Sequence, residues 1–195
     1  MIEDSFIDIL GCALSGNRAP EAAALLAAAR DLGDGPAPVL GAGARLAAPQ
    51  AAFVNASASH LEEMDDWEAP GNTHPSAVIW PAIWALAAIR PVSGDKALRA
   101  YAAGFETIAR LGEAVNFDHY NRGWHSTATL GAAGAGRGQG KGPGQGSTAG
   151  PRSAAGQGRG SGSALADTQS LSSASALLAS NFGSARGAPT CSYIQ

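Results

Sequence analysis

Residues 93–111 read SGDKALRAYAAGFETIARL and carry the clearest helical pattern of the chain. Their large apolar side chains recur three or four positions apart, which places them in one stripe along a helix. The stripe consists of Leu98, Tyr101, Phe105, Ile108 and Leu111. Ser93 and Asp95 stand where the N-terminal cap of such a helix is expected. The stretch therefore predicts an amphipathic helix.

The sequence on both sides of this helix is helical in character as well. Apolar residues at helical spacing, prolines suited to a first turn and glycines at stop positions mark further helices. The predicted helices span residues 2–16, 20–33, 49–60, 76–89 and 126–135, and the predicted loops span residues 34–48, 66–73 and 116–125. No segment alternates apolar and polar residues for long enough to predict a sheet, although Val39 and Leu40 suit a short extended piece. We therefore predict an all-α fold for residues 1–130.

Composition separates the rest of the chain from this helical part. Residues 1–130 hold 8 Lys and Arg against 15 Asp and Glu, a net charge of −7, whereas residues 131–195 hold 5 against 1, a net charge of +4. Residues 131–164 contain no Val, Ile, Leu, Met, Phe, Trp or Tyr. They lack the apolar area that would offset the ~1–2 kcal/mol per residue of backbone ordering. We predict that residues 131–164 are disordered and that residues 165–195 form a weakly structured tail.

The bulk properties exclude several classes of protein. A net charge of −3 and an isoelectric point near 5.7 give no reason to expect a nucleic-acid or membrane partner for the whole chain. The cysteines, Cys12 and Cys191, form no CxxC metal motif, and the acidic N-terminus has no signal-peptide pattern. The most apolar stretch, residues 77–89, contains a proline and is shorter than the roughly 18–20 residues of a membrane span. We expect a cytoplasmic location.

A first polar cluster reads HLEEMDDWE at residues 60–68 and continues with NTHP at residues 72–75. On a helix, His60 and Glu63 would share one face. The cluster is consistent with a carboxylate and imidazoles that line a pocket for acid–base chemistry, or with a solvated acidic helix end. His60, Glu63 and His74 are also conceivable metal ligands, but their spacing matches no strong metal motif, so no metal is predicted.

A second polar cluster reads DHYNRGWHST at residues 118–127. His125 precedes Ser126 and Thr127, which open a helix of small residues. The N-terminus of a helix favours an anion such as a substrate carboxylate, because its backbone N–H groups are free to donate. Alternatively, Ser126 or Thr127 only caps the helix, and His125 is a surface loop residue.

Several short motifs, read in order, resemble the MmgE/PrpD family, which includes 2-methylcitrate dehydratase, cis-aconitate decarboxylase and iminodisuccinate epimerase. The motifs are DILGCALSG (8–16), VNASASH (54–60), DD (65–66), HPS (74–76), PA (81–82), AAGFE (102–106) and RGWHSTATLG (122–131). The resemblance rests on the order and spacing of these motifs rather than on any one of them. Fainter matches return at residues 168–170 and 181–184.

The resemblance implies a cofactor-free lyase or isomerase that acts on a small di- or tricarboxylate. It further implies a large helical domain, a smaller α/β domain and a homodimer in intact relatives. By position, Glu63, His74 and His125 fall on catalytic pocket positions, with Asp66 and Trp67 beside them and Ser126 and Thr127 at the anion-binding helix start. Glu63 stands where the family more often has Asp, and Trp67 where a small hydroxyl residue is common. The particular acid and reaction therefore stay open.

The chain is expected to be a fragment of the helical domain, without the α/β domain, and to be inactive by itself. Charge that builds up next to a carboxylate needs cationic donors, which the family draws largely from later sequence. A change of reading frame near codon 131 is one hypothesis for the basic, glycine-rich interlude. The alternative function is non-catalytic: residues 131–164 would act as a disordered Arg/Gly arm that binds nucleic acid.

Overall fold

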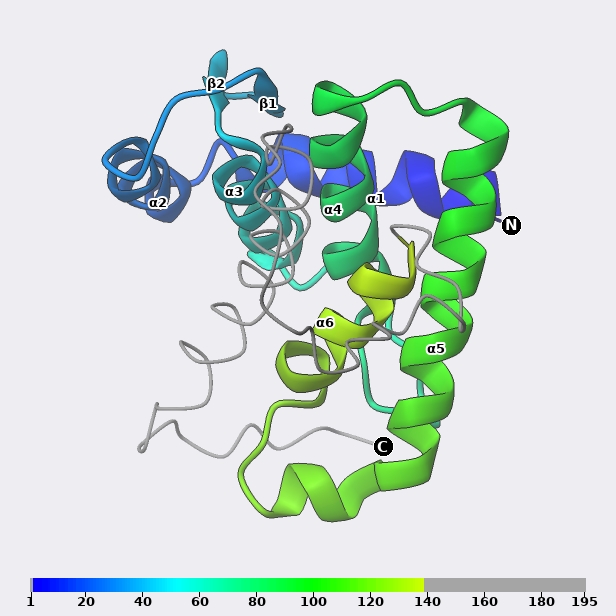
Figure 1. The fold of residues 1–195 in the computed structure, drawn as a ribbon. Helices are drawn as coiled ribbons and strands as arrows, with labels where there is room; N and C mark the ends of the chain where they lie inside the picture. The colour runs from blue at the N-terminus through cyan, green and yellow to red at the C-terminus, as the bar shows by residue number, and fades with distance from the viewer. Residues whose placement is uncertain (1, 139–195) are drawn as a thin grey trace, which may run out of the picture.

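The computed structural model describes residues 2–138, and this region is built mainly from helices (Figure 1). The elements are α1 (Ile2–Gly16), α2 (Pro20–Arg30), β1 (Ala37–Val39), β2 (Ala44–Leu46), α3 (Ala48–His60), α4 (Pro75–Ile89), α5 (Gly94–Asn121) and α6 (Ser126–Gly138). The prediction of a mostly helical fold is confirmed. Within residues 2–138, no helix combines the length and apolar character that crossing a bilayer requires.

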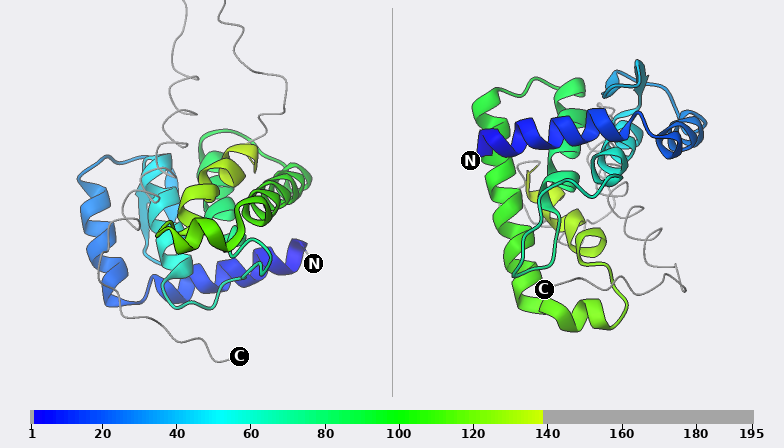
Figure 2. Two further views of the ribbon diagram at one scale, coloured as in Figure 1. Left: turned by 90° about the horizontal axis from the view of Figure 1, so that it is seen from below. Right: turned by 180° about the vertical axis from the view of Figure 1, so that it is seen from behind.

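Helix α4 lies at the centre of the fold and packs against α1, α3, α5 and α6. Figure 1 shows α6 on the near side of α4 and α1 crossing behind it, and the view from behind in Figure 2 has α1 in front. The long helix α5 runs along one edge, while α2 and the β1–β2 hairpin lie at the opposite end, next to α3. Because α4 has neighbours on several sides, it is apolar almost all round, and Ile79, Trp80 and Ile83 are buried.

The predicted stripe of α5 faces this central helix. Tyr101 and Ile108 are buried, and the Tyr101 ring stacks on Trp80 with ring centroids 4.7 Å apart. Leu111, at the end of the predicted stripe, is 39% exposed, because α5 has by then passed beyond the central core. The Ser93 side chain accepts a hydrogen bond from the backbone N–H of Lys96 at 3.4 Å, which confirms the predicted cap.

Helix α5 also continues to Asn121, so the predicted loop at residues 116–125 begins about a turn and a half too early. The aromatic and polar side chains of these last turns lie mostly on the exposed face, where apolar periodicity gives no signal. Asp118 and Arg122 form an i,i+4 ion pair at 2.9 Å, a pairing that supports a helix end. His119 donates to or accepts from the Thr129 hydroxyl at 2.7 Å, which ties the end of α5 to α6.

Helix α6 begins at Ser126 as predicted and reaches Gly138, so the helix predicted at 126–135 is confirmed and the overlapping prediction of disorder is wrong for residues 131–138. The prediction counted only the apolar area of the segment itself. Small residues instead let the α6 backbone approach the large side chains of other helices: a Cβ at Gly131 would lie 3.1 Å from Val78, and one at Gly134 would lie 3.1 Å from Ile108. Residues 139–164, the remainder of the predicted disordered segment, and the predicted tail at 165–195 lie outside the described residues.

The predicted loop at residues 34–48 contains a small antiparallel hairpin, in which Ala37 pairs with Leu46 and Val39 with Ala44. Strands of three residues are too short to show an alternating pattern in the sequence. A buried side chain of α3 holds the hairpin in place. The Asn55 amide donates to the carbonyl of Pro38 and accepts from the backbone N–H of Leu40, both at 2.9 Å.

We expect Asn55→Ala to lower the free energy of unfolding by on the order of 2–4 kcal/mol, because it removes a buried side chain that bonds two partly buried backbone groups and leaves both without that partner. Asn17→Ala is the matched control, since the Asn17 side chain makes one partly buried bond, to the Ala13 carbonyl at 3.1 Å. It should cost about 1 kcal/mol or less. Urea unfolding followed by circular dichroism measures both, and equal costs would contradict the role given to Asn55.

Candidate active site

Three histidines from different parts of the chain meet where the C-terminus of α3 faces the N-termini of α4 and α6. His60 is the last residue of α3, His74 immediately precedes α4 and His125 immediately precedes α6. The ring centroids of His60 and His74 are 4.5 Å apart, and those of His60 and His125 are 6.4 Å apart. The fold thus turns two polar clusters that are remote in sequence into one site.

A buried carboxylate organises two of these imidazoles. The Asp65 side chain has 0% exposure, and its two oxygens lie 2.9 and 3.1 Å from Nδ1 of His60. One of these oxygens, Oδ2, is also 3.2 Å from Nδ1 of His74, within ion-pair distance but outside hydrogen-bond geometry, so Nδ1 of His74 has no hydrogen-bond partner among the described residues. Burial would raise the pKa of Asp65, but its contacts with His60 and His74 outweigh it and hold this pKa at about 2. Asp65 is therefore a carboxylate that bridges two rings.

The surroundings push the pKa values of His60 and His125 in opposite directions. Burial disfavours the His60 cation, yet the hydrogen bond and charge of Asp65 outweigh it and raise the His60 pKa. Burial lowers the pKa of His125, and the positive charge that His60 and His74 can carry lowers it further. The backbone N–H of Ala128 donates a long hydrogen bond, of 3.4 Å, to Nδ1 of His125.

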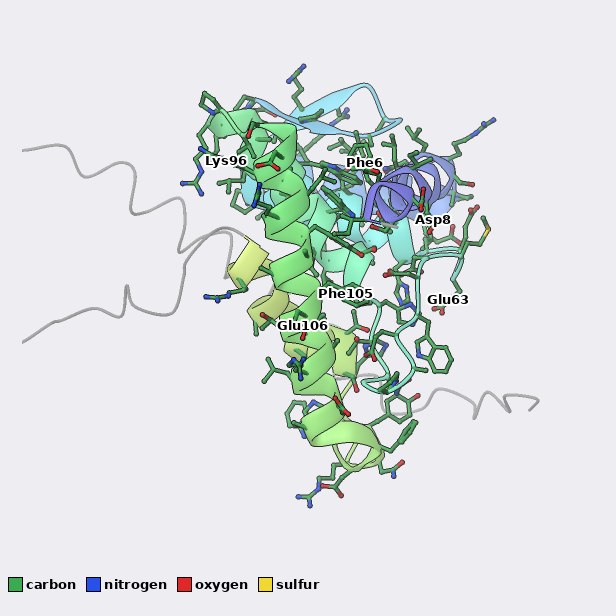
Figure 3. The ribbon with its side chains drawn as sticks, turned by 90° about the vertical axis from the view of Figure 1, so that its right-hand side faces the viewer. Phe6, Asp8, Glu63, Lys96, Phe105 and Glu106 are labelled. Carbon is green, nitrogen blue, oxygen red and sulfur yellow. The ribbon has the colours of Figure 1, made fainter. Side chains whose placement is uncertain are left out.

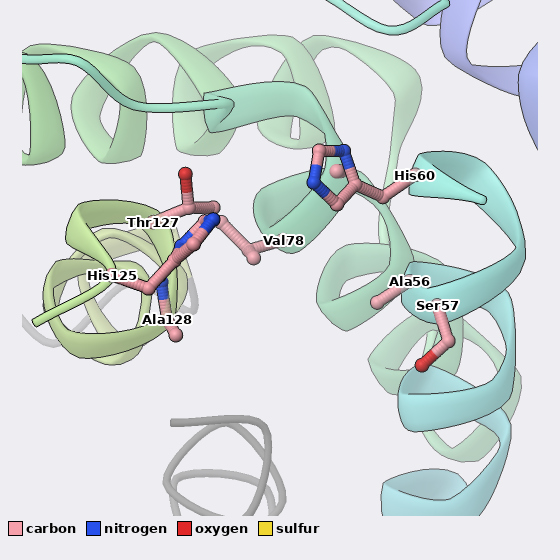
Figure 4. A pocket seen from close by; sticks show the side chains of 8 residues that line it. Ala56, Ser57, His60, Val78, His125, Thr127 and Ala128 are labelled. Atoms are coloured by element: carbon pink, nitrogen blue, oxygen red, sulfur yellow. The ribbon is translucent and has the colours of Figure 1, made fainter. Parts of the chain in front are cut away.

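His60 and His125 stand on opposite sides of a pocket (Figure 4). Its lining consists of Ala56, Ser57, His60, Ala77, Val78, His125, Thr127 and Ala128. The hollow is small, with a cavity volume of about 40 Å³. Among the described residues that line it there is no Lys or Arg, so the polar groups are imidazoles and hydroxyls on an apolar floor.

Glu63, one of the residues predicted to be catalytic, lies beside His60 at the outer edge of the site. Its carboxylate Oε1 is 3.6 Å from Nε2 of His60, and its side chain is 65% exposed on the loop at the edge of the molecule (Figure 3). Its backbone has a φ of 52°, in the left-handed region that non-glycine residues seldom adopt. The structure thus brings Glu63, His74 and His125 around one site, with His60 among them.

Two of the residues predicted to bind substrate, Asp66 and Trp67, do not line the pocket. Asp66 accepts hydrogen bonds from the backbone N–H and hydroxyl of Ser76, at 3.0 and 2.9 Å, and so anchors the first turn of α4. Trp67 is exposed and donates to the Asn72 side chain at 3.2 Å. Both are directed to groups of the loop and of α4, whereas His60 and His125 line the pocket.

The two hydroxyl residues at the start of α6 are buried. Thr127 lines the pocket, and its hydroxyl accepts a hydrogen bond from the backbone N–H of His74 at 2.9 Å. This bond connects the polar cluster at residues 60–75 with the one at residues 118–127. The Ser126 hydroxyl has no hydrogen-bond partner among the described residues. The sequence pattern assigned no role to Asp65, and it indicated His60 either as one of the imidazoles of an acid–base pocket or as a metal ligand. No local signal separates Asp65 from Asp66, because the difference in their partners arises from the fold.

His60, Glu63 and His74 could hold a metal ion, because each places a possible ligand atom within 4.8 Å of the others. The prediction that no metal is required stays a prediction. We expect elemental analysis of the purified chain to find no stoichiometric zinc or iron. Stoichiometric metal that is lost in His60→Ala or His74→Ala would contradict it.

The His60–Asp65 pair predicts a pH-dependent contribution to stability. His60 has a raised pKa, so its contribution is complete below the ordinary value of 6.5 and is lost as the pH rises through its folded pKa. Asp65 has a lowered pKa, so its contribution is complete above 3.8 and is lost as the pH falls towards about 2. The cost of Asp65→Asn in unfolding free energy should therefore be largest between about pH 4 and about pH 6.5. Urea unfolding of both proteins across pH tests this, and a constant cost would contradict it.

Comparison with known proteins agrees with the motifs in the sequence. The model of the MmgE/PrpD N-terminal domain matches residues 1–185. A cis-aconitate decarboxylase-like protein of Aspergillus oryzae is 32% identical over 135 residues, which cover 65% of this chain and 28% of that protein. The match therefore spans less than a third of the length of this relative.

Proposed function

Because this chain belongs to the MmgE/PrpD family, we propose that its pocket binds a di- or tricarboxylic acid and moves a proton at a carbon next to a carboxylate. The observation that carries the proposal is the pair of imidazoles on opposite sides of the pocket, whose pKa values are shifted in opposite directions. Two titratable groups whose environments separate their pKa values form an acid and a base within one site.

In this proposal His125 is the base. It is neutral near pH 7, and it takes the substrate proton at Nε2 in the tautomer that carries its hydrogen on Nδ1. The long contact from the backbone N–H of Ala128 to Nδ1 is given up in that tautomer. His60 and His74 supply the positive charge that stabilises negative charge developing on the substrate carboxylate. Glu63 orients the substrate or assists proton removal from the loop. The Thr127 hydroxyl accepts from His74 and keeps its own proton to donate to a substrate oxygen.

The proposal covers three reactions of such acids: dehydration, decarboxylation and epimerisation. Dehydration, decarboxylation and epimerisation next to a carboxylate all pass through negative charge on the neighbouring carbon, so one pocket chemistry serves each of them. The printed name of the Aspergillus relative makes cis-aconitate the first substrate to test. Since the described lining has no Lys or Arg, we propose that turnover by this chain alone is slow. One missing donor can lower a rate by about 10²–10³-fold.

The test is to incubate the 195-residue chain with cis-aconitate in D₂O and follow the acid by proton NMR. The methylene protons between the double bond and a carboxylate are the most acidic carbon-bound protons of this substrate. We expect their exchange for deuterium to depend on the folded protein and to be easier to detect than loss of CO₂ or addition of water. If the chain neither binds cis-aconitate nor promotes this exchange, the proposed function is overturned. If turnover is rapid, the expectation of slow catalysis is overturned.

A further inference from the structure

Asp65 has no part in the proposed acid–base chemistry, yet it is the most enclosed charged group of the site. We propose that Asp65 is a positioning residue: it holds the rings of His60 and His74 by their Nδ1 atoms and thereby directs both Nε2 atoms towards the carboxylates of the substrate. This inference rests on the proposed function, because it names the residue that prepares the same site for an anionic ligand.

The first argument is the burial of the Asp65 carboxylate. A carboxylate whose side chain has 0% exposure is strongly unfavourable unless hydrogen bonds compensate it. Asp65 meets this requirement with the hydrogen bond from His60 at 2.9 Å, and Nδ1 of His74 lies within ion-pair distance at 3.2 Å. Its neighbour Asp66 is instead bound to Ser76. The fold thus uses one of two adjacent carboxylates to hold a helix start and the other to hold two rings.

The second argument is the shape of imidazole. The two ring nitrogens point in divergent directions, so a ring that turns Nδ1 to Asp65 turns Nε2 away from it. Of the two rings, His60 lines the pocket. A carboxylate that accepts Nδ1–H fixes the tautomer and orientation of a histidine and stabilises the imidazolium that forms when Nε2 takes a proton. Asp65 does this for His60 through a hydrogen bond, and its contact at 3.2 Å with Nδ1 of His74 brings the second ring to the same carboxylate.

The third argument is that an anionic group already stands beside one Nε2. The Glu63 carboxylate lies 3.6 Å from Nε2 of His60, while Asp65 occupies Nδ1 of the same ring. The Glu63 side chain is mostly exposed, so a substrate carboxylate can displace it without opening the core. His125 faces His60 with ring centroids 6.4 Å apart and closes the other side of this space.

The experiment uses the whole chain labelled with ¹⁵N-histidine and tricarballylate, a saturated tricarboxylate, as the probe. The ¹⁵N shifts of the rings report which nitrogen carries the proton, and their changes on titration give the affinity for tricarballylate. An Asn at position 65 offers one neutral acceptor oxygen in place of two charged ones, and its NH₂ group cannot accept a hydrogen bond, so it cannot reproduce the contacts that both oxygens of Asp65 make. We expect Asp65→Asn to change the tautomer or orientation of at least one of the two histidines and to weaken tricarballylate binding by about tenfold or more.

Two further variants separate positioning from general damage to the loop. Glu68→Gln removes a carboxylate that accepts the backbone N–H of Gly71 in the same loop at 2.9 Å but touches neither ring, and it should leave tautomers and affinity unchanged. Asp65→Glu keeps the charge and should recover part of the affinity. If Asp65→Asn does not fold, His60→Gln removes one directed ring at a partly exposed position, and the same loss of affinity is expected.

The outcomes distinguish this inference from the function on which it rests. If the wild-type chain binds tricarballylate and a folded Asp65→Asn or His60→Gln binds it equally well, the inference fails and the proposed function stands. If the wild-type chain does not bind tricarballylate, the proposed substrate class fails, and the carboxylate-directing role of Asp65 fails with it.

Discussion

His125→Ala should lower the rate of protein-dependent proton exchange on cis-aconitate by about 10²–10⁴-fold, the usual contribution of a positioned general base or acid. The imidazole lines the pocket, and burial keeps it neutral and able to accept a proton near pH 7. Proton NMR in D₂O, with substrate in excess over protein, measures the rate. The free energy of unfolding of the variant should change little, because the ring is only partly buried.

His119→Ala is the matched control for this experiment. His119 is also partly buried and is bound to Thr129 of α6, but it belongs to the end of α5 and does not line the pocket. We expect a modest loss of stability and an unchanged exchange rate. A folded His125→Ala protein that exchanges protons as fast as wild type would remove His125 from the proposed chemistry. Equal losses in both variants would point to general disturbance of the α5–α6 connection.

Gly16→Ala should lower the free energy of unfolding by about 3 kcal/mol. Gly16 is the last residue of α1 and packs directly on the backbone of α3. A Cβ placed there would overlap the carbonyl oxygen of Ala58 and lie 2.9 Å from its carbonyl carbon. Neither group is the end of a flexible side chain, so the two helices have to move apart, and the contact between α1 and α3 loosens.

Gly11→Ala, in the same helix, provides the opposite expectation. A Cβ at Gly11 meets no atom of the described residues within 4 Å. Alanine is the better helix former, so this substitution should raise the free energy of unfolding by about 0.5–1 kcal/mol. Urea unfolding of both variants gives the comparison directly. A Gly16→Ala protein as stable as Gly11→Ala would show that α1 does not approach α3 as closely as described.

Local signals accounted for the parts of the fold that local forces determine. The periodic stripe of residues 93–111 predicted α5, and Ser93 caps it as expected. Apolar periodicity and composition did not predict the ends of α5 and α6, because these ends are held by residues that are distant in the sequence. The last turns of α5 hold no apolar stripe, and residues 131–138 hold no large apolar side chain, but both are ordered against neighbouring helices.

The site shows the same division. Residue types and motif order identified Glu63, His74 and His125 as the residues to examine, and the tertiary structure brings them together. The roles of Asp65 and His60 depend on contacts that cross the loop after α3. Two adjacent aspartates, Asp65 and Asp66, are chemically alike in sequence and receive different partners only when α4 is in place.

The sequence by itself determined that this chain is helical and belongs with the MmgE/PrpD proteins, because helix periodicity and short motifs are encoded by neighbouring residues. The tertiary structure decided which carboxylate is buried between two imidazoles, which histidine loses its charge and how far α6 extends. Each of these depends on desolvation and on hydrogen bonds between segments that meet only after folding. The burial of Asp65 and the lowered pKa of His125 therefore follow from where the fold places these residues.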